Sequence, residues 1–184
     1  MDIELVAVAA EDKPVLAHLI QLYLHDFSEF EALELSMHGT FDYPWLDHYF
    51  TSHDREAYLI TVDGRPAGFA LTRHDVEADP DAWNLAEFFV VRRHRHRGVG
   101  REAARRLFRA RPGTWTLSYL DHNGPAARLW STVLDTIAEG RVTYTHNDPP
   151  SVPAPVSHVR FRVGGRRESR AGEPPQRRSG PGER

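Results

Sequence analysis

An apolar segment that leads into a glycine-rich and arginine-rich helix start constrains this fold more than any other feature of the sequence. Residues 83–91 (WNLAEFFVV) are almost continuously apolar, which predicts a central strand that is covered on both faces. After residues 95–100 (RHRGVG), an amphipathic pattern predicts a helix, whose buried stripe is Val99, Ala103, Ala104, Leu107 and Phe108. The chain therefore passes from a buried strand through a tight glycine turn into a helix that packs on the sheet.

The other predicted elements alternate around this unit. Residues 56–62 and 65–73 form a hairpin pattern, because Asp63-Gly64 supplies the positive φ angles of a tight turn. Further strands are predicted over 3–9, 114–120, 140–146 and 157–163, and helices over 14–27, within 43–50 and from about Pro125. One domain is expected over 1–163. The tail 164–184 has no large apolar residue, which predicts disorder.

Composition excludes several classes of protein. The chain has no cysteine, so a disulfide framework and a thiolate metal site are impossible. The pair His94 and His96 lies among arginines that repel a cation, so no metal is expected. The apolar run near the N-terminus is too short for a membrane span, and it lacks the basic start of a signal peptide. Both features indicate a cytoplasmic protein.

Charge is strongly separated along the chain. Residues 1–60 carry twelve acidic side chains against Lys13 and Arg55, whereas residues 92–111 carry nine arginines against Glu102. A helix start presents free backbone N–H groups, glycines admit an anion to the main chain, and arginines add full charges. The sequence therefore predicts a pyrophosphate cradle. The Lys-Ser/Thr ending of a P-loop is missing, as is the third glycine of the dinucleotide fingerprint.

Two motifs carry a resemblance to a known family. Arg95 to Gly100 (RHRGVG) matches Arg/Gln-x-x-Gly-x-Gly/Ala, and Asn123 to Trp130 (NGPAARLW) matches Asn-x-x-Ala-x-x-Leu/Phe-Tyr, one strand later. Both resemble the GNAT family, the Gcn5-related N-acetyltransferases that use acetyl-coenzyme A. The resemblance implies the α/β (α+β) fold of that family: a mixed, largely antiparallel twisted sheet of about seven strands, flanked by about four helices.

The resemblance also implies a set of residues for acetyl-coenzyme A. The main chain at the helix start would hold the pyrophosphate, and the end of the preceding strand would pair with the pantetheine arm. In this family the fourth and fifth strands separate to admit that arm. Asn123 would touch the coenzyme or cap its helix. The implied residues are Phe89, Val90, Val91, Arg95, His96, Arg97, Gly98, Val99, Gly100, Arg101, Asn123, Ala126 and Trp130.

Amine acetylation needs a base, because an alkyl ammonium ion has a pKa of about 10.4. Glu87 lies on the central strand beside Phe88 and Phe89, which would shield its carboxyl from water and so raise its pKa. Its position also resembles that of the base in the histone-modifying branch of the family. Trp130 occupies the position of the tyrosine that often protonates the leaving thiolate, and an indole cannot do so. Tyr119, His122 or water are the alternatives. The amine would attack directly, through a tetrahedral intermediate.

The acceptor is predicted to be a primary amine of a small molecule or protein. Residues 25–50 combine Asp26, Glu29, Glu31 and Asp42 with Tyr43, Trp45 and Tyr49, a combination that suits a cationic amine. Two other functions stay open: an inactive acyl-coenzyme A sensor or scaffold, and a nucleic-acid-binding module, which the absence of interleaved aromatics disfavours. No membrane partner is expected, and the chain is a monomer or a homodimer.

Overall fold

A single mixed sheet organises the protein. The computed structural model describes residues 1–74, 79–147 and 155–165. The seven strands lie in the order β1-β2-β3-β4-β5-β7-β6. They are β1 Ile3–Ala7, β2 Arg55–Val62, β3 Arg65–His74, β4 Ala82–Val90, β5 Gly113–Leu120, β6 Thr143–Asn147 and β7 Val156–Val163. The helices are α1 Lys13–Phe27, α2 His48–Thr51, α3 Val99–Ala110 and α4 Gly124–Ile137, and η1 Ala10–Asp12 and η2 Arg92–His94 are 3-10 turns.

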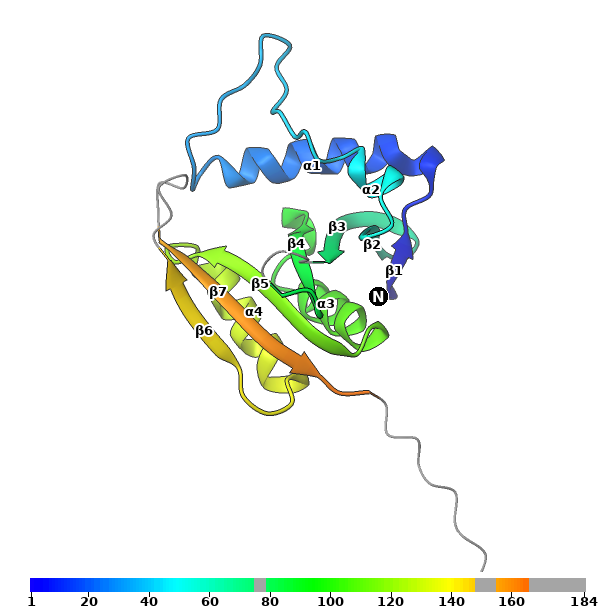
Figure 1. Ribbon diagram of the computed structural model, residues 1–184. Coiled ribbons are helices and arrows are strands. Elements are labelled where there is room, and N and C mark those ends of the chain that lie inside the picture. Colours follow the sequence, from blue (N-terminus) through cyan, green and yellow to red (C-terminus); the bar gives the residue numbers. More distant parts are fainter. Residues whose placement is uncertain (75–78, 148–154, 166–184) are drawn as a thin grey trace, which may run out of the picture.

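This arrangement confirms the predicted α/β class and sheet. The β4–β5 pair is parallel, and the other neighbouring strands of the described sheet pair antiparallel. Helices α1 and α2 pack on one face of the sheet, and α3 and α4 pack on the other (Figure 1). Since α1 contacts β2, β3 and β4, the β5–β7–β6 half of that face stays open.

Local sequence patterns explain most of these elements. The stripe predicted for α3 is its buried set: Val99, Ala103, Ala104, Leu107 and Phe108. Asp63 and Gly64 have φ angles of 50° and 74°, as the tight turn between β2 and β3 requires. The apolar run 83–91 forms β4, which lies between β3 and β5.

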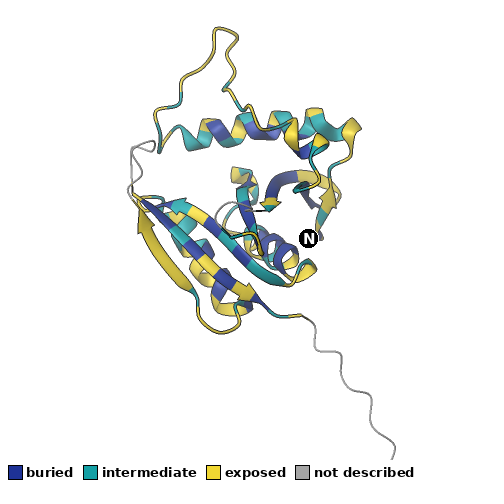
Figure 2. Cartoon of the chain, viewed as in Figure 1, coloured by how far each residue is buried: buried dark blue, intermediate teal, exposed yellow. Residues whose placement is uncertain are grey.

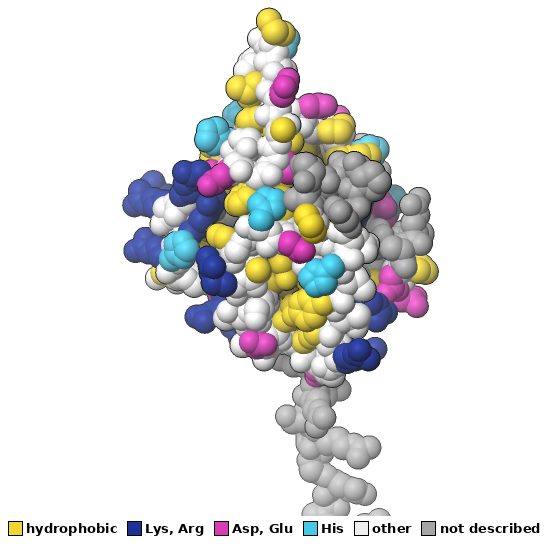
Figure 3. Space-filling model, turned by 90° about the vertical axis from the view of Figure 1, so that its left-hand side faces the viewer, with side chains coloured by type: hydrophobic (Ala, Val, Ile, Leu, Met, Phe, Trp, Pro, Cys, Tyr) yellow, Lys and Arg dark blue, Asp and Glu magenta, His cyan; other side chains and the backbone are white. Residues whose placement is uncertain are grey.

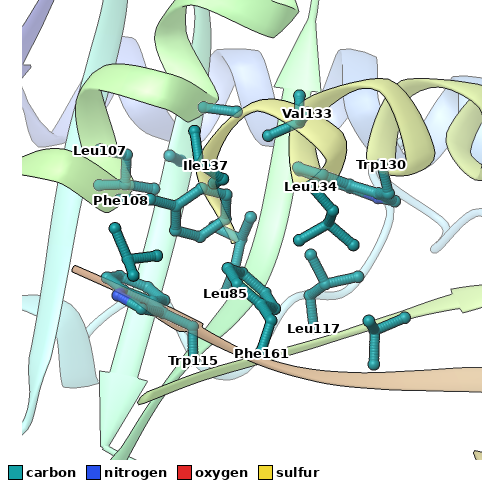
Figure 4. Close-up of a cluster of buried hydrophobic side chains, with 14 residues drawn as sticks. Leu85, Leu107, Phe108, Trp115, Leu117, Trp130, Val133, Leu134, Ile137 and Phe161 are labelled. Carbon is teal, nitrogen blue, oxygen red and sulfur yellow. The ribbon is translucent and has the colours of Figure 1, made fainter. Parts of the chain in front are cut away.

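The largest part of the core lies between α3, α4 and the sheet (Figure 4). Phe108 is fully buried and meets Trp115 edge-on, with ring centroids 4.8 Å apart, and Phe161 at 5.1 Å. A second cluster lies under α1, and Figure 2 shows that the inner side of α1 is buried whereas β6 is exposed. The sheet is therefore anchored from both faces by aromatic and aliphatic packing.

Some boundaries differ from the sequence prediction. In the segment 43–50 only the last residues are helical, because α2 begins at His48 and the preceding residues form turns. The first strand ends at Ala7 rather than at residue 9. β7 ends at Val163, the last residue of the predicted domain. The predicted tail lies outside the described residues, apart from Gly164 and Gly165.

Two irregularities in β4 shape the centre of the sheet. The β4–β5 ladder has four residue pairs and ends at Leu85 and Leu117, so beyond this point the two strands separate. In the β3–β4 ladder, Leu71 pairs with Glu87 but Thr72 pairs with Leu85. Ala86 is thus an extra residue, and this bulge reverses the alternation of side chains along β4.

Gly68 makes the close approach of β3 to β4 possible. A Cβ atom on Gly68 would lie 2.0 Å from the carbonyl oxygen of Phe89. We expect Gly68→Ala to lower the free energy of unfolding by about 2 kcal/mol or more, because the strands must shift apart. Urea denaturation measures this loss. Gly64→Ala is the control: its Cβ meets nothing within 4 Å, so it should cost only the left-handed strain of about 1 kcal/mol. Equal losses in the two variants would contradict the account.

Candidate functional site

Two cavities are lined by neighbouring residues of β4, near the point where β4 and β5 separate. The first, here the helix-start groove, has a volume of about 740 Å³ and lies between the end of α1, the end of β4 and the starts of α3 and α4. The second, the sheet-face pocket, has a volume of about 750 Å³ and lies over β4, β5, β7 and β6 on the face that carries α1 and α2. Phe88 and Phe89 line the groove and Glu87 lines the pocket, so consecutive residues of β4 face both cavities.

The helix-start groove collects most of the residues predicted for a coenzyme. Phe89, Val90, Arg95, His96, Gly98, Gly100, Arg101, Asn123, Ala126 and Trp130 line it. Three predicted residues do not: Val91 packs against the cluster under α1, Arg97 is exposed, and the Val99 side chain is fully buried in the core. The prediction for Val99 concerned its backbone N–H group, and the prediction for Arg97 concerned both its backbone N–H group and its place beside the pyrophosphate; both stay predictions.

The backbone at the start of α3 is shaped for close contact. Gly98 is the N-cap residue of α3 and has a left-handed φ of 82°, and His96 has a φ of 57°. Gly98 has no side chain that could cap this helix start, so the first N–H groups of α3 have no acceptor from their N-cap residue. A Cβ atom on Gly100 would meet Phe88 and Leu129 at 3.7 Å. The glycines keep the helix start free of side chains, and its dipole favours an anion.

Asp26 at the end of α1 neutralises part of this positive charge. Its carboxylate accepts a hydrogen bond from Arg92 Nε at 2.9 Å and pairs with Arg95. Although partial burial acts to raise it, the hydrogen bonds and charges of the two arginines hold the pKa of Asp26 below its ordinary value. Arg95 also donates from Nε to the carbonyl oxygen of Val90 at 2.7 Å. α1 is therefore tied to the segment that joins β4 to α3.

The start of α4 forms the opposite wall of the groove. The Asn123 side chain accepts a hydrogen bond from the Ala126 N–H at 3.1 Å, which confirms its role as a helix cap. Trp130 is 6% exposed and meets Phe88 edge-on, with centroids 5.2 Å apart. Its indole thus packs between the sheet and α4 while one edge reaches the groove.

Figure 3 shows Lys and Arg side chains gathered at the left-hand side of this face, with acidic side chains beside them. Several arginines of residues 92–111 are paired: Arg105 and Arg106 bind Glu102, and Arg111 binds Glu56. Within the ranges that the structure describes, no three histidine or acidic side chains are grouped to hold a metal ion. Over the same residues, no helix has the length and apolarity of a membrane span.

Glu87 is the central charged group of the sheet-face pocket. The bulge at Ala86 turns Glu87 toward the face of α1, whereas Leu85 and Phe88 face α3 and α4. Tyr23 of α1 donates a hydrogen bond from its hydroxyl to Glu87 Oε2 at 2.6 Å, and the Tyr43 hydroxyl lies 3.4 Å from Oε1. The sequence analysis identified Glu87 but not its partner Tyr23, because in the sequence Tyr23 is only one of the apolar positions of a predicted helix.

Burial raises the pKa of Glu87 above its ordinary value. The hydrogen bonds from Tyr23 and Tyr43 and the positive charge of Arg73 act in the opposite direction, because they stabilise the carboxylate. Burial and the neighbouring Glu87 raise the pKa of Tyr23 well above the ordinary value of a phenol, so Tyr23 stays protonated and donates. This carboxylate is thus desolvated, oriented and able to accept a proton.

Tyr119 does not lie near Glu87. On β5 it follows the alternation of Trp115 and Leu117, so it packs toward α4, and it lines neither cavity. His122 is exposed, and its ring lies 5.6 Å from that of Phe30. Tyr119, which the sequence predicts as the proton donor, therefore contacts neither cavity.

Sequence reasoning missed a polar pair in the same pocket. Ser118 Oγ and His158 Nδ1 are 2.7 Å apart, on neighbouring strands β5 and β7, and both residues line the pocket with Glu87. Only the pairing register of β7 with β5 brings them together, and no spacing in the sequence signals it. Ser118 is the first residue of β5 beyond the β4–β5 ladder, so this pair lies where the strands separate.

The predicted acidic and aromatic acceptor site is only partly assembled. Tyr43, Trp45 and Tyr49 line the sheet-face pocket. The four predicted acidic residues do not: Asp26 and Glu29 line the groove instead, and Glu31 and Asp42 line neither cavity. This part of the prediction is wrong because Asp26 pairs with arginines of the groove. Beside these aromatics the pocket is lined by Arg55, Arg73 and Arg160, and its two carboxylates are Asp79 and Glu87, which lie outside the predicted segment.

Residues 16–133 match the sequence model of the acetyltransferase (GNAT) family. The fold is similar to that of an acetyltransferase from Thermus thermophilus, with a TM-score of 0.61 and 16% identity over 89% of this chain and 98% of that one. It is also similar to the ribosomal-protein-S18-alanine N-acetyltransferase of Escherichia coli, with a TM-score of 0.56 and 16% identity over 91% and 98% of the two chains.

A third similar structure is an aminoglycoside acetyltransferase, AAC(6')-Ib, in complex with coenzyme A. It has a TM-score of 0.60 and 12% identity over 88% of this chain and 95% of that one. No match was found among curated proteins. At these identities the solved structures establish a shared fold, and the family model covers well over half of the chain.

Proposed function

Because the chain belongs to the GNAT acetyltransferase family and is thus an acyltransferase, we propose that it moves an acetyl group from acetyl-coenzyme A to a primary amine of a small molecule or protein. The observation that carries this proposal is that consecutive residues of β4 line two cavities where β4 and β5 separate, with Glu87 in one cavity and Phe88 in the other. One cavity suits a pyrophosphate-bearing coenzyme, and the other is free for an acceptor.

The helix-start groove fits acetyl-coenzyme A. The N–H groups from Gly98 to Arg101 would hold the pyrophosphate, with Arg95 beside them. The unpaired edge of β4 from Phe89 to Val91 would hold the pantetheine arm, and Trp130 with Phe88 would form its apolar wall. When bound, the coenzyme supplies the activated acetyl group.

Glu87 is proposed as the general base. An amine acceptor reaches the site as an ammonium ion at neutral pH, and Glu87 accepts its proton so that the neutral nitrogen can attack directly. The raised pKa of the buried carboxyl brings its basicity nearer to that of the amine. Tyr23 holds Oε2 by a 2.6 Å hydrogen bond, whereas Oε1 has only the longer 3.4 Å contact with Tyr43 and would be the oxygen that receives the acceptor's proton.

Return of a proton to the leaving thiolate does not require Trp130. The Ser118–His158 pair lies at the same strand junction and has an exchangeable proton. We propose this pair, in place of Tyr119, as the protein's proton donor, with water as the alternative. Trp130 then serves to pack the groove wall.

We predict that Glu87→Gln lowers kcat/KM by about 100- to 10,000-fold, the usual contribution of a general base. In the native protein the rate should fall as pH drops through the raised pKa of Glu87, because protonation removes the base. This acidic limb should be absent in Glu87→Gln. Initial rates of coenzyme A release across pH measure both effects.

Tyr23→Phe is the matched control. It removes the hydrogen bond that stabilises the Glu87 carboxylate, so the pKa of Glu87 should rise and the acidic limb should move to higher pH. The phenyl ring keeps its packing against Phe69 and Phe89. Unchanged pH profiles in both variants would exclude Glu87 as the base.

We predict that Trp130→Phe retains most turnover, because Trp130 packs the wall and carries no proton to the reaction. The variant should lose stability by about 1–2 kcal/mol, since Phe is smaller and leaves a cavity beside Phe88 and Phe108. Steady-state kinetics and urea unfolding measure these quantities. A loss of turnover near a thousandfold, at the level of a lost acid–base group, would contradict the packing role.

The sensor hypothesis makes an opposite prediction. If the protein binds acetyl-coenzyme A but releases no coenzyme A with any amine, whether small molecule or peptide, it is a binding protein of the same fold.

A further inference from the structure

We propose that the sheet-face pocket recognises an acceptor that carries a carboxylate as well as an amine, so that the substrate class is a compact amino acid. Arg55 and Arg73 would bind the carboxylate, and Glu87 would receive the proton of the amine. This inference rests on the proposed function, because it names the acceptor of the same reaction.

A continuous row of polar side chains crosses the face of the sheet in this pocket. The register pairs Arg55 with Arg73, and Arg73 with Asn84, on neighbouring strands. It then continues across the remaining strands, so that the row contains Arg55, Arg73, Asn84, Thr116, Arg160 and Thr143. All six line the pocket. Residues from separate parts of the chain thus form one polar strip.

The charges in this row are unbalanced at one end. Arg160 is paired with Asp79, whose carboxylate lies 2.6 Å from Arg160 Nε. Arg55 and Arg73 are directly opposite each other, and across the described residues neither one has a carboxylate within ion-pair distance. Like charges at directly opposite positions destabilise a sheet. An anionic ligand at this point would relieve that repulsion.

The two guanidinium groups are held in place by neutral neighbours. Arg55 lies over the rings of Trp45 and Tyr49, with its guanidinium carbon 5.8 and 5.5 Å from the two centroids. Arg73 donates from Nε to Asn84 Oδ1 at 3.3 Å, and Asn84 is itself fixed by Thr116 Oγ1 at 3.0 Å. These contacts orient both forks and leave their other N–H groups for a ligand. Guanidinium groups bind carboxylates with two parallel hydrogen bonds.

The distance from this row to Glu87 limits the size of the acceptor. On β3, Arg73 belongs to the polar row and Leu71 pairs with Glu87. The row and Glu87 are therefore separated by two residues along β3, or about 7 Å. A molecule whose amine and carboxylate are a few bonds apart can reach both ends. A polycationic amine would instead meet two arginines that have no ion-pair partner among the described residues, and these would repel it.

Matched acceptors test the proposal directly. Standard amino acids, their carboxamides and their decarboxylated amines would be compared at fixed acetyl-coenzyme A, with kcat/KM measured for each. We expect the kcat/KM of at least one amino acid to be about 10- to 100-fold higher than that of its carboxamide and of its decarboxylated amine. This ratio corresponds to the free energy of charge-assisted hydrogen bonds to a carboxylate. Equal rates within every matched set would overturn the carboxylate site but leave the acetyltransferase function intact.

Arginine variants test whether Arg55 and Arg73 are the residues that bind the carboxylate of the acceptor. Arg55→Gln and Arg73→Gln should raise KM for the preferred amino acid by about tenfold or more, with a smaller change in kcat, and should leave KM for its carboxamide nearly unchanged. Arg65→Gln is the control, because Arg65 lies exposed at the other end of the same hairpin. Equal KM values in all three variants and the native protein would contradict the proposal.

A binding measurement separates this proposal from the proposed function. Thermal unfolding with each amino acid and its carboxamide, in the presence of coenzyme A, needs no turnover. We expect a Tm rise with the preferred amino acid that is lost in Arg55→Gln. If no amine is acetylated but this rise is seen, the acetyltransferase function fails and the carboxylate site stands. If no amino acid raises Tm or is acetylated, the carboxylate site fails.

Discussion

The early end of the β4–β5 ladder is the constraint on which the rest of the site depends. A parallel pair in the centre of a sheet normally satisfies the backbone groups of both strands, but here pairing stops at Leu85 and Leu117. Beyond this point β5 continues beside β7, and β4 continues beside β3. The edge of β4 that faces away from β3 is therefore open in the middle of the fold, between two cavities. A ligand arm that pairs with this edge would replace the missing strand.

The bulge at Ala86 gives this opening its chemistry. If β4 ran as a regular strand through Ala86, Leu85 and Glu87 would share a face, and the carboxylate would point into the apolar cluster under α3 and α4. The bulge sends Glu87 to the opposite face, where Tyr23 and Tyr43 meet it. Phe88 then faces Trp130 and Gly100. One inserted residue thus separates an acid–base side from a coenzyme side.

The sequence predicted those parts of the molecule that local patterns encode. The stripe of α3, the Asp63-Gly64 turn and the central strand follow from periodicity and turn chemistry, and the two motifs indicated the family. It could not predict contacts that depend on register between distant strands. The alignment of Arg55 with Arg73 and the Ser118–His158 pair arise from ladders that no local spacing specifies. The sequence predicts Asp26 to lie in the acceptor site, because its charge is evident in the sequence whereas its pairing with Arg92 and Arg95 appears only in the fold.

The central claim is that the start of α3 binds the pyrophosphate of acetyl-coenzyme A, and calorimetric titration tests it most directly. The native protein and Gly98→Asp would be titrated at low and high salt, with circular dichroism to verify that both are folded. Aspartate tolerates a left-handed φ of 82° better than most residues, so the variant mainly adds a negative charge to the cradle. The account predicts saturable binding that weakens with salt and is lost in Gly98→Asp. Absence of binding to the native protein, or equal affinity in the variant, would contradict it.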